Sequence, residues 1–488
     1  MKSMRGVAML GILGVVATVA GAAGTVLYLQ SQGVAPRALA PYLERRSEGH
    51  NRFIYDSSHQ IGASLRTLDR GAGLPLLLPA MRVGAQAAAA EGKGGAVKDV
   101  DSNDALLRAM AVAVPGDVIT IAPGVYRFNR AVTANRSGVA GVPITVRAAQ
   151  PGGVTIEFAT VEGFLVRAPH WRFENLTIRG VCRNDRSCEH AFHVVGGATH
   201  FAAVNNTILD FNAHFKINGA RVQGGGGPVF PDHGLIESNT LSNSAPRRTH
   251  NPVTPVDLVG ASDWTIRGNL ITDFIKTGGD RVSYGAFAKG GGARTVFERN
   301  VVWCEARLRG QPGQRVGLSL GGGGTEKAYC RDGKCINEQQ DGVVRDNLVA
   351  SCSDVGIYLN SASGSRVEHN TLVDTTGIDV RYPASSATLE GNLVDGPIRS
   401  RDEGVLHLGD NRSTALGWSY VGRHPVRALL RDWESGDYAW KDDAPRRDAG
   451  VERPDLCGRK RAAAPAYGAF EDFTACLTPQ TSSSNSAN

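Results

Sequence analysis

The most constraining feature of this sequence is a short motif, here called the asparagine phrase, that recurs eight times between residues 173 and 394. In each copy an apolar residue is followed by one or two polar residues, an asparagine and a second apolar run. The shared asparagines are Asn175, Asn206, Asn239, Asn269, Asn300, Asn347, Asn370 and Asn392, with spacings of 31, 33, 30, 31, 47, 23 and 22 residues. A period of this size is typical of stacked units that cannot bury their apolar faces alone.

Each unit has the pattern of β-strands. Apolar residues alternate with period two, and the residue types are mainly Val, Ile, Leu, Thr and Phe. We therefore predict an all-β fold in which one unit is one coil of a parallel β-helix. At a bend shared by all coils, the asparagine amides are expected to form a hydrogen-bonded ladder, with a structural and not a catalytic role.

The ends of the chain differ from the repeats. Lys2 and Arg5 precede an apolar stretch at 6–29, so residues 1–30 are predicted to be a signal peptide or a signal anchor. In either case the body is expected outside the cytoplasm, as a periplasmic, membrane-anchored or secreted protein. Residues 31–95 are rich in Pro, Ala and Gly and suggest a flexible spacer. The β-helix is predicted over 96–412, and residues 413–488 as a C-terminal extension with a disordered tail.

Composition excludes some partners. Glycine supplies 60 of 488 residues, which suits many tight turns, and the net charge is only +6. Clusters of Lys or Arg interleaved with aromatic residues are absent, so no nucleic-acid partner is expected. We expect a monomer, with membrane contact only through the N-terminal segment if that segment is not cleaved.

The eight cysteines all follow the N-terminal apolar segment, and an exported protein can pair them as disulfides. Proximity in the sequence pairs Cys182 with Cys188 and Cys330 with Cys335. Cys304 lies four residues after Asn300 and Cys352 five after Asn347, so these two are expected to meet on stacked strands. Cys457 then pairs with Cys476. No pair of CxxC units with zinc-ligand spacing is present.

Three segments carry a family resemblance. Residues 101–126 combine a polar cap, a short amphipathic helix and a strand, which resembles the opening of right-handed β-helix proteins that act on polysaccharides. Residues 137–156, with a Gly-x-Pro-Ile-Thr strand, are similar to the chondroitinase B and alginate lyase family. Residues 455–471 are similar to the closing segment of many such secreted proteins. The resemblance implies a single-stranded, right-handed, pectate-lyase-like β-helix with an N-terminal capping helix, and a lyase acting on an acidic polysaccharide.

The strands before the asparagine phrases predict a surface groove. Aligning them by their apolar residues places His193, Lys216, Asp257, Ser319, Tyr358 and Asp379 in one outward row, and Asn218, Lys289, Asn360 and Arg381 in the next. Since coils stack about 4.8 Å apart, such rows match the length of a sugar chain. Substrate binding is predicted for Asn218, Asp257, Ser319, Tyr358, Asn360, Asp379 and Arg315.

β-Elimination on a uronate needs a neutralised carboxylate, a base for the C5 proton and an acid for the leaving oxygen. The resemblance implies that Lys289 is the base, and Lys216 is the competing candidate. The family's partner arginine is not matched, because Leu318-Ser319-Leu320 stands where it is expected. Arg315 or Arg381 would have to substitute for it, and His193 is a further acid or base candidate.

A hard cation such as Ca²⁺ could also neutralise the substrate carboxylate through oxygen ligands. Asp210, Glu237 and Asp257, with Asn218, lie on neighbouring coils and are the candidate ligands.

Two other function classes stay open. One is a polysaccharide hydrolase or epimerase, although the motifs expected for either are missing from this sequence. The other is a non-catalytic solenoid that binds carbohydrate or mediates surface adhesion.

Overall fold

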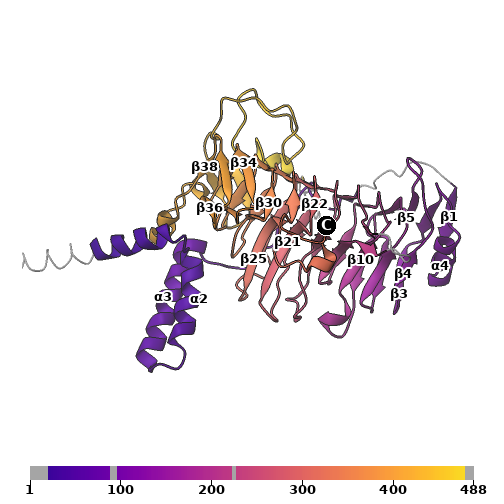
Figure 1. Ribbon diagram of the computed structural model, residues 1–488, viewed down its shortest axis with the longest axis horizontal. Helices are drawn as coiled ribbons and strands as arrows, with labels where there is room; N and C mark the ends of the chain where they lie inside the picture. Colours follow the sequence, from indigo (N-terminus) through magenta and orange to yellow (C-terminus); the bar gives the residue numbers. More distant parts are fainter. Residues whose placement is uncertain (1–19, 88–95, 222–226, 479–488) are drawn as a thin grey trace, which may run out of the picture. The chain divides into compact units, whose positions relative to one another are not determined.

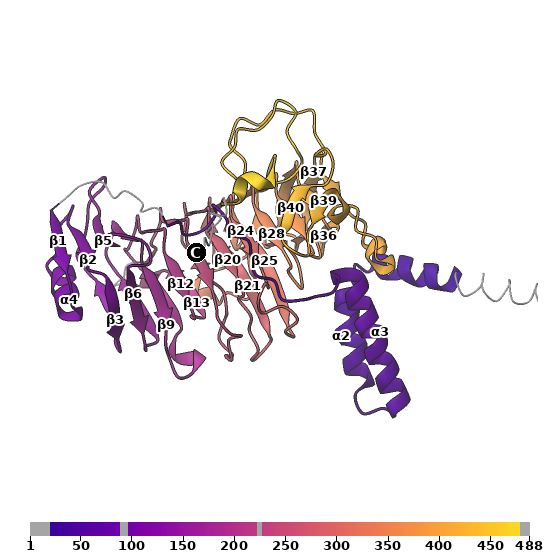
Figure 2. The ribbon, with the colours of Figure 1, turned by 180° about the vertical axis from the view of Figure 1, so that it is seen from behind.

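Parallel strands stacked in three long sheets make up most of the chain in the computed structural model, which describes residues 20–87, 96–221 and 227–478. The chain divides into two units, one of residues 1–73 with 414–425 and the other of residues 74–413 with 426–488. The second unit contains the sheets (Figures 1 and 2).

The first sheet has 12 strands: β1 (Val97–Val100), β2 (Val118–Ile121), β5 (Ile144–Ala148), β8 (Trp171–Glu174), β11 (Ala202–Val204), β16 (Leu235–Glu237), β19 (Thr265–Arg267), β23 (Val296–Glu298), β27 (Val343–Arg345), β31 (Ser365–Glu368), β34 (Ser386–Glu390) and β37 (Val405–Leu408). The second sheet has 10: β4 (Val132–Ala134), β7 (Glu162–Val166), β10 (His190–Val195), β13 (Ala213–Asn218), β18 (Val256–Val259), β21 (Val282–Lys289), β25 (Gln314–Gly321), β29 (Ile357–Asn360), β33 (Ile378–Arg381) and β36 (Ile398–Arg401). The third has 11: β3 (Gly124–Phe128), β6 (Val154–Phe158), β9 (Thr177–Gly180), β12 (Thr207–Leu209), β17 (Thr240–Ser242), β20 (Leu270–Thr272), β24 (Val301–Trp303), β28 (Leu348–Ala350), β32 (Thr371–Val373), β35 (Leu393–Val394) and β38 (Arg412–Ser413).

Short elements decorate these sheets. They are the pair β14 (Ala220–Arg221) and β15 (Pro228–Val229), the three strands β22 (Gly292–Ala293), β26 (Gln339–Gln340) and β30 (Ala362–Ser363), the pair β39 (Leu430–Asp432) and β40 (Asp437–Trp440), and the 3-10 turns η1 (Asp185–Ser187), η2 (Lys327–Tyr329), η4 (Arg427–Leu429) and η5 (Phe473–Cys476). The predicted fold, a right-handed parallel β-helix in which each full coil gives one strand to each long sheet, is confirmed.

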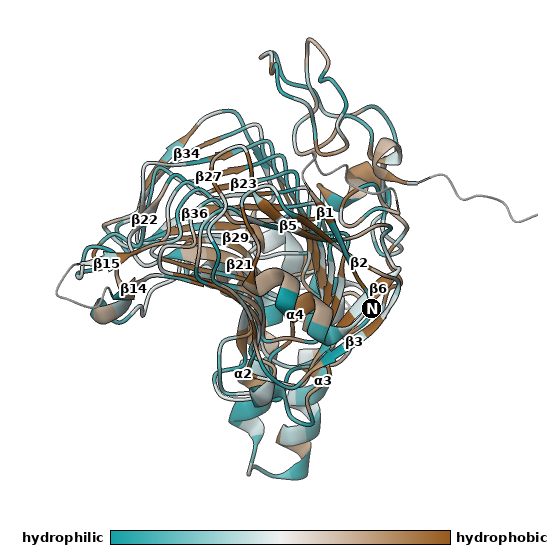
Figure 3. Cartoon of the chain, turned by 90° about the vertical axis from the view of Figure 1, so that its right-hand side faces the viewer, coloured by the Kyte–Doolittle hydropathy of each residue, from teal (hydrophilic) through white to brown (hydrophobic). Residues whose placement is uncertain are grey.

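The core between the three sheets consists of apolar side chains stacked coil upon coil. Phe164, Phe192 and Phe215 are fully buried, and their rings stack at centroid distances of 5.2 and 5.3 Å. Figure 3, which views the coils along the stack, shows brown apolar stretches on the strands. Since the inward positions are filled, polar residues on alternate positions of a strand must face outward.

The asparagine ladder is confirmed, with one shift in its position. From Asn206 onward each side-chain amide donates to the Oδ1 of the next asparagine at 2.8–3.0 Å, through Asn239, Asn269, Asn300, Asn347, Asn370 and Asn392 to Asn411. Asn175 is not a rung. It aligns with Asn205, one residue before the ladder, and receives a hydrogen bond from Asn205 at 2.8 Å. The phrase at 173–178 is offset by one residue, so Leu176 takes the ladder position.

The open end of the stack is covered as predicted. Helix α4 (Asn103–Ala111) buries Leu106 and Met110 in the core, and the hydroxyl of Ser102 caps its first turn by accepting a hydrogen bond from the backbone of Ala105. All four predicted disulfides are present: Cys182–Cys188, Cys304–Cys352, Cys330–Cys335 and Cys457–Cys476.

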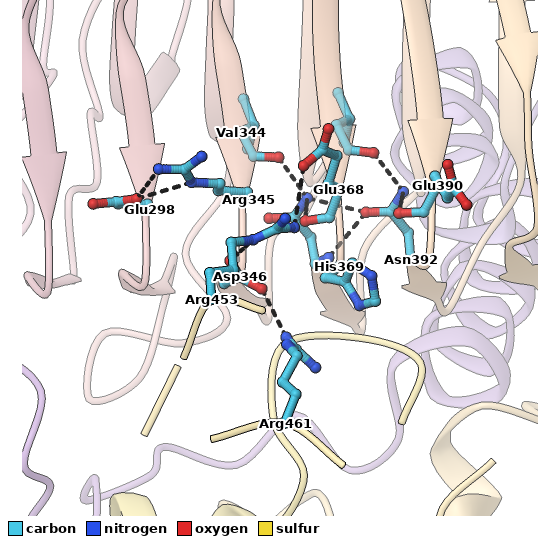
Figure 4. A network of polar contacts seen from close by, with 12 residues as sticks. Glu298, Val344, Arg345, Asp346, Glu368, His369, Glu390, Asn392, Arg453 and Arg461 are labelled. Atoms are coloured by element: carbon cyan, nitrogen blue, oxygen red, sulfur yellow. Dashed lines mark hydrogen bonds and ion pairs between the residues drawn. The ribbon is translucent and has the colours of Figure 1, made fainter. Parts of the chain in front are cut away.

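The C-terminal extension packs against the third sheet. Tyr438, Phe470 and Phe473 are buried with Trp303 and Leu348. Ion pairs fix the same segment to the turn after β27, where Arg453 and Arg461 each contact Asp346 at 2.7 Å (Figure 4). Residues 479–488, the predicted disordered tail, lie outside the described residues.

The prediction of a flexible spacer over 31–95 is wrong for its first half. Helices α2 (Pro36–Ser47) and α3 (Arg52–Arg70) form an antiparallel pair in the smaller unit, which also contains η3 (Leu416–Val421). Arg37 binds both carboxylate oxygens of buried Asp69, and Asn51 caps α3 by accepting from Ile54. Composition alone suggested a spacer, but the periodic apolar residues of α3 are those of an amphipathic helix.

Most of the predicted targeting segment, residues 1–19, lies outside the described residues. Among the helices of the described ranges, none combines the length and the apolar character that crossing a membrane would require.

Candidate functional site

The second sheet forms the floor of the candidate site, and its register confirms both predicted rows. His193, Lys216 and Asp257 are paired strand to strand, and the row continues through Phe287, Ser319, Tyr358 and Asp379. The adjacent row contains Asn218, Val259, Lys289, Gly321, Asn360 and Arg381. The predicted alignment across long loops therefore has the correct register.

Over strands β13, β18 and β21 lies a cleft of about 640 Å³, which we call the main cleft. It is lined by Lys216, Asn218, Pro252, Thr254, Asp257, Val259, Lys276, Asp280, Val282, Tyr284, Phe287, Lys289, Gly322, Gly323, Gly324, Thr325, Glu326 and Tyr329. The residues 322–329 come from the long loop after β25, and residues 252–254 and 276–280 come from the loops before β18 and β21. The insertions of the irregular coils thus form the walls.

Lys289 differs from the other lysines of the main cleft. Its Nζ lies 4.6 Å from the ring centroid of Phe287 and makes no hydrogen bond or ion pair with any residue in the described ranges. Burial lowers the pKa of Lys289; Asp257 and Glu338 oppose this shift, and the charge of Lys216 adds to it. A larger fraction of this amine is therefore neutral at a given pH than for an exposed lysine.

The other two lysines of the main cleft are paired with carboxylates. Lys216 Nζ lies 2.9 Å from Asp257 Oδ2, and Lys276 Nζ lies 2.7 Å from Asp280 Oδ1. Burial raises the pKa of Asp280, but the hydrogen bonds from Lys276 and from the backbone of Val282 bring the pKa below its ordinary value. Each of these two lysines therefore has a carboxylate within hydrogen-bond distance, which Lys289 does not have among the described residues.

Tyr284 and Phe287 form the aromatic part of the floor. Their rings meet edge to face at 5.5 Å, so Tyr284 and Lys289 both contact Phe287. Burial raises the pKa of Tyr284 to about 12, and the phenol is therefore protonated over the physiological range. A protonated phenol is a hydrogen-bond donor and a candidate acid.

The loop over residues 321–338 separates the main cleft from a second cavity. Gly321, Gly323 and Gly324 have φ of 72°, 65° and 68°, a left-handed region that favours glycine. At Gly322 a Cβ would lie 2.9 Å from Cδ of Lys289, so a larger residue would press on that side chain. The glycine run therefore lets the backbone pass close to Lys289.

Charged side chains fix this loop at both ends. Glu338 accepts hydrogen bonds from the backbone of Gly290 at 2.8 Å and from Thr325 Oγ1 at 2.9 Å. Arg331 binds both oxygens of Asp232 at 2.8 Å and lies over the ring of Phe230 at 4.8 Å. The wall of the main cleft is thus held by polar contacts as well as by the Cys330–Cys335 disulfide.

The second cavity, of about 820 Å³, extends along the same sheet. Three predicted residues, Tyr358, Asn360 and Arg381, line it, and Arg381 donates to the Tyr358 hydroxyl at 3.3 Å. Its charged lining residues are the cations Lys327, Lys334 and Arg381 and the single carboxylate Glu338. This part of the sheet therefore favours an anionic ligand.

Three predicted binding residues, Ser319, Asp379 and Arg315, are at most 1% exposed and line neither cavity, whereas the largely buried Asp257 and Asn360 do line one. The Ser319 hydroxyl donates within the sheet to Gly321 at 2.6 Å, and Asp379 is fully buried beneath Arg399 and Arg401. Arg315 is 1% exposed and pairs with buried Glu305. Outward direction was predicted correctly for Ser319 and Asp379, but the side chains and loops that cover them could not be seen in the strand pattern.

The predicted calcium ligands do not come together. Asp210 follows β12 of the third sheet, Glu237 is in β16 of the first, and Asp257 is in β18 of the second. Each also has a cationic partner: Arg179 at 3.2 Å, Arg267 at 2.6 Å and Lys216 at 2.9 Å, respectively. This set does not fit a calcium ion, because spacing by one coil along the chain does not place residues on the same face.

Sequence reasoning missed Lys276, Tyr284 and Phe287. Phe287 occupies the row position between Asp257 and Ser319, but an aromatic residue was not considered among polar ones. Tyr284 lies three residues earlier on the same strand, a spacing that strict alternation would place on the opposite face, so the strand pattern gave no signal for it. Lys276 lies in a loop, where the strand pattern gives no position.

Comparison with known proteins agrees with this fold. Residues 190–414 match the family model described as right handed beta helix region. Pectate lyase L of Dickeya chrysanthemi is 27% identical over 158 residues, which are 30% of this chain and 32% of that protein. The chain therefore spans about a third of the length of this curated relative.

One solved structure gives the same result for the fold. The crystal structure of pectate lyase Pel9A matches with a TM-score of 0.52 and 15% identity over 78% of this chain and 97% of that one. An alginate lyase from Paenibacillus sp. str. FPU-7 matches with a TM-score of 0.33 and 12% identity over 65% of this chain and 95% of that one. The chain is a right-handed parallel β-helix protein, similar in fold to pectate lyase Pel9A.

Proposed function

We propose that this protein is an exported polysaccharide lyase that cleaves a uronate-containing polysaccharide by β-elimination in the main cleft. The observation that carries the proposal is the contrast among three lysines of one cleft. Lys216 and Lys276 are ion-paired, whereas the Lys289 amine lies over an aromatic ring, has no hydrogen bond or ion pair with the residues that the structure describes, and has a lowered pKa. An amine with a lowered pKa beside ion-paired charges is what proton abstraction from an acidic sugar requires.

In the proposed reaction the neutral Lys289 amine takes the C5 proton of the uronate. The electron pair of the C5–H bond forms the C4–C5 double bond, and the bond from C4 to the glycosidic oxygen breaks. The Tyr284 hydroxyl, protonated because its pKa is raised to about 12, gives its proton to the leaving oxygen. The chain thereby supplies base and acid from two side chains that contact the same ring, Phe287.

The substrate carboxylate needs a positive partner, because C5 becomes acidic only when that charge is balanced. Lys216 and Lys276 lie in the main cleft, and Lys327, Lys334 and Arg381 line the second cavity. An acidic chain along the sheet would therefore meet cations over several coils. Arg381 lies three strands beyond Lys289 and is paired with Asp402, so it would bind an acidic sugar further along the polysaccharide, whereas Lys216 and Lys276 would balance the carboxylate of the reacting sugar.

Export is supported by the four disulfides. Disulfides form and persist in oxidising compartments outside the cytoplasm. The apolar N-terminal stretch is of the type that directs a chain to the export machinery. A periplasmic, secreted or membrane-anchored location agrees with both.

The test is incubation of the full chain with a panel of uronate polymers and detection of the ultraviolet absorbance of the new C4–C5 double bond. Lys289→Ala and Lys289→Arg should both be inactive, because arginine retains the charge but does not release its proton. Lys216→Ala should retain part of the activity. If Lys216→Ala is inactive and Lys289→Arg is active, Lys216 is the base. New reducing ends without the absorbance indicate a hydrolase, and retention on a glycan column without product indicates a binding protein.

A further inference from the structure

At one end of the site, strands β7 and β10 bring together three side chains that the proposed reaction does not use. One ligand atom from each of Glu162, His190 and His193 lies within 4.8 Å of the other two. The described ranges contain one other group of this kind, Cys330, Asp332 and Cys335, in which the two sulfurs are joined as a disulfide and have no thiolate to offer.

We infer that Glu162, His190 and His193 form a binding site for a transition-metal cation, with Zn²⁺ as the best match. Two imidazoles and one carboxylate are a common protein ligand set for zinc, and such sets leave a coordination position open. Calcium is a poor match for the same site, because it prefers six to eight oxygen ligands. The inference does not depend on the proposed lyase activity.

The hydrogen bonds of His193 favour a cation beside its Nδ1. His193 Nε2 lies 2.9 Å from Asn218 Oδ1, and the Asn218 amide nitrogen donates to Gly219 O at 2.9 Å, so this oxygen faces the ring. Nε2 must then carry a proton and donate it. Nδ1 lies 2.7 Å from Glu162 Oε1, and two lone pairs at this distance require a proton or a metal ion between them.

The distances are compatible with an ion after a small movement. Ligand bonds to zinc are about 2.0–2.2 Å, which places two ligand atoms of a tetrahedral site roughly 3.3 Å apart. The Glu162–His193 distance of 2.7 Å would open by about half an ångström, and the other separations, none above 4.8 Å, would close by at most about 1.5 Å. Rotation about the side-chain torsions of a glutamate and a histidine covers this range.

His190 supplies the second, independent observation. Its Nδ1 is buried and has no hydrogen-bond partner among the described residues. An unsatisfied buried nitrogen normally has a partner in the native state. Lys216, on the neighbouring strand β13, is paired with Asp257 at 2.9 Å.

Asn218 would act as a positioning residue for this site. It fixes the ring of His193 through Nε2, as the outer partners of zinc-bound histidines usually do. It also lines the main cleft, so the metal site adjoins the surface on which a ligand would lie. Its replacement by alanine is expected to weaken Zn²⁺ binding about 10- to 100-fold without removing a ligand.

The experiment uses the full chain without a histidine tag, freed of metal with a chelator. Calorimetric titration with Zn²⁺ should show one ion per chain, and Co²⁺ should give the visible absorption of a tetrahedral complex. His190→Ala, His193→Ala and Glu162→Gln should each weaken Zn²⁺ binding more than the change expected for Asn218→Ala. Zn²⁺ should raise the melting temperature of the wild type but not of these variants.

The matched control is His200→Ala. His170, His200 and His233 form a second histidine cluster, with rings stacked at 4.5 and 5.0 Å, on an exposed corner. The inference requires His200→Ala to bind Zn²⁺ like the wild type. Three outcomes would each overturn the inference: loss of binding in the His200 variant, unchanged binding in the Glu162 and His193 variants, or no saturable binding at all. The last outcome would indicate that only a proton joins Glu162 and His193. Glu162→Gln nearly preserves the side-chain shape and keeps the test valid if a histidine variant does not fold.

Discussion

Two regions of the stack, the asparagine ladder and the outward rows of the second sheet, differ in whether their polar side chains have hydrogen-bond or ion-pair partners. At the asparagine corner the same residue is repeated from Asn206 to Asn411, and each amide is satisfied by its neighbours. Along the second sheet the repeated position holds different residues, and Lys289 is left without an ion-pair partner in the described ranges. Repetition of one side chain stabilises the stack, whereas variation at an equivalent position creates a surface with chemistry.

The largest expected effect is on the rate of elimination, at Lys289 in the second sheet. Lys289→Met should lower the rate of elimination about 10³- to 10⁴-fold, the upper part of the range for a general base. The same variant should be as stable as the wild type or more stable by up to about 1 kcal/mol, because burial opposes the charged amine. Product absorbance and urea denaturation measure the two quantities. An unchanged rate in a folded Lys289→Met protein would remove Lys289 from the mechanism.

The reverse outcome is expected at the asparagine corner. Asn300→Ala removes an Oδ1 that accepts from the backbone and the amide of Asn269, and a donor to Ile266 and Asn347. Since these groups are buried, we expect a loss of about 2–4 kcal/mol in the free energy of unfolding. The rate per folded molecule should not change. Asn411→Ala, at the end of the ladder, should cost clearly less, and equal losses for both variants would contradict the ladder account.

A smaller effect is expected where the wall of the main cleft is anchored. Arg331→Ala removes a two-point contact with Asp232 and the stacking on Phe230, which together hold the loop over 321–338. We expect KM to rise about tenfold, which corresponds to about 1.4 kcal/mol, with little change in kcat. Arg294→Ala is the matched control, because Arg294 makes a similar two-point contact with Asp263 but lies outside the loop over 321–338 and lines neither cavity. A rise in KM for both variants would indicate a general surface effect.

The same contrast explains how much could be predicted from the sequence. The coil, the capping helix, the disulfides and the register of both rows follow from local patterns, because a strand's neighbour in a solenoid is the equivalent strand one coil away. Burial of Ser319, Asp379 and Arg315 did not follow, because loops and side chains from other coils cover them. The predicted first member of the ladder, Asn175, is wrong by one position. The segments at 173–178 (FENLTI) and 204–209 (VNNTIL) look equivalent in sequence, but in the structure Asn175 aligns with Asn205 and not with Asn206.

The smallest expected effect concerns the pH profile of the same cleft. Elimination requires neutral Lys289, so the rate should rise with pH through the pKa of that amine. Asp257 raises this pKa, while Lys216, which Asp257 neutralises in part, lowers it. Asp257→Asn removes the carboxylate that raises the pKa of Lys289 and leaves the charge of Lys216, which lowers it, without its partner. Both changes shift the rising limb of the pH profile to lower pH.

The measurement is the rate of double-bond formation across pH, with each variant normalised to its own plateau, so that altered binding does not enter the comparison. Asp280→Asn is the matched control, because Asp280 pairs with Lys276 and is not among the groups that shift the pKa of Lys289. The limb of this control should stay where the wild type has it. A limb that stays where the wild type has it, or that moves to higher pH, would contradict the assignment of Lys289 as the titrating base.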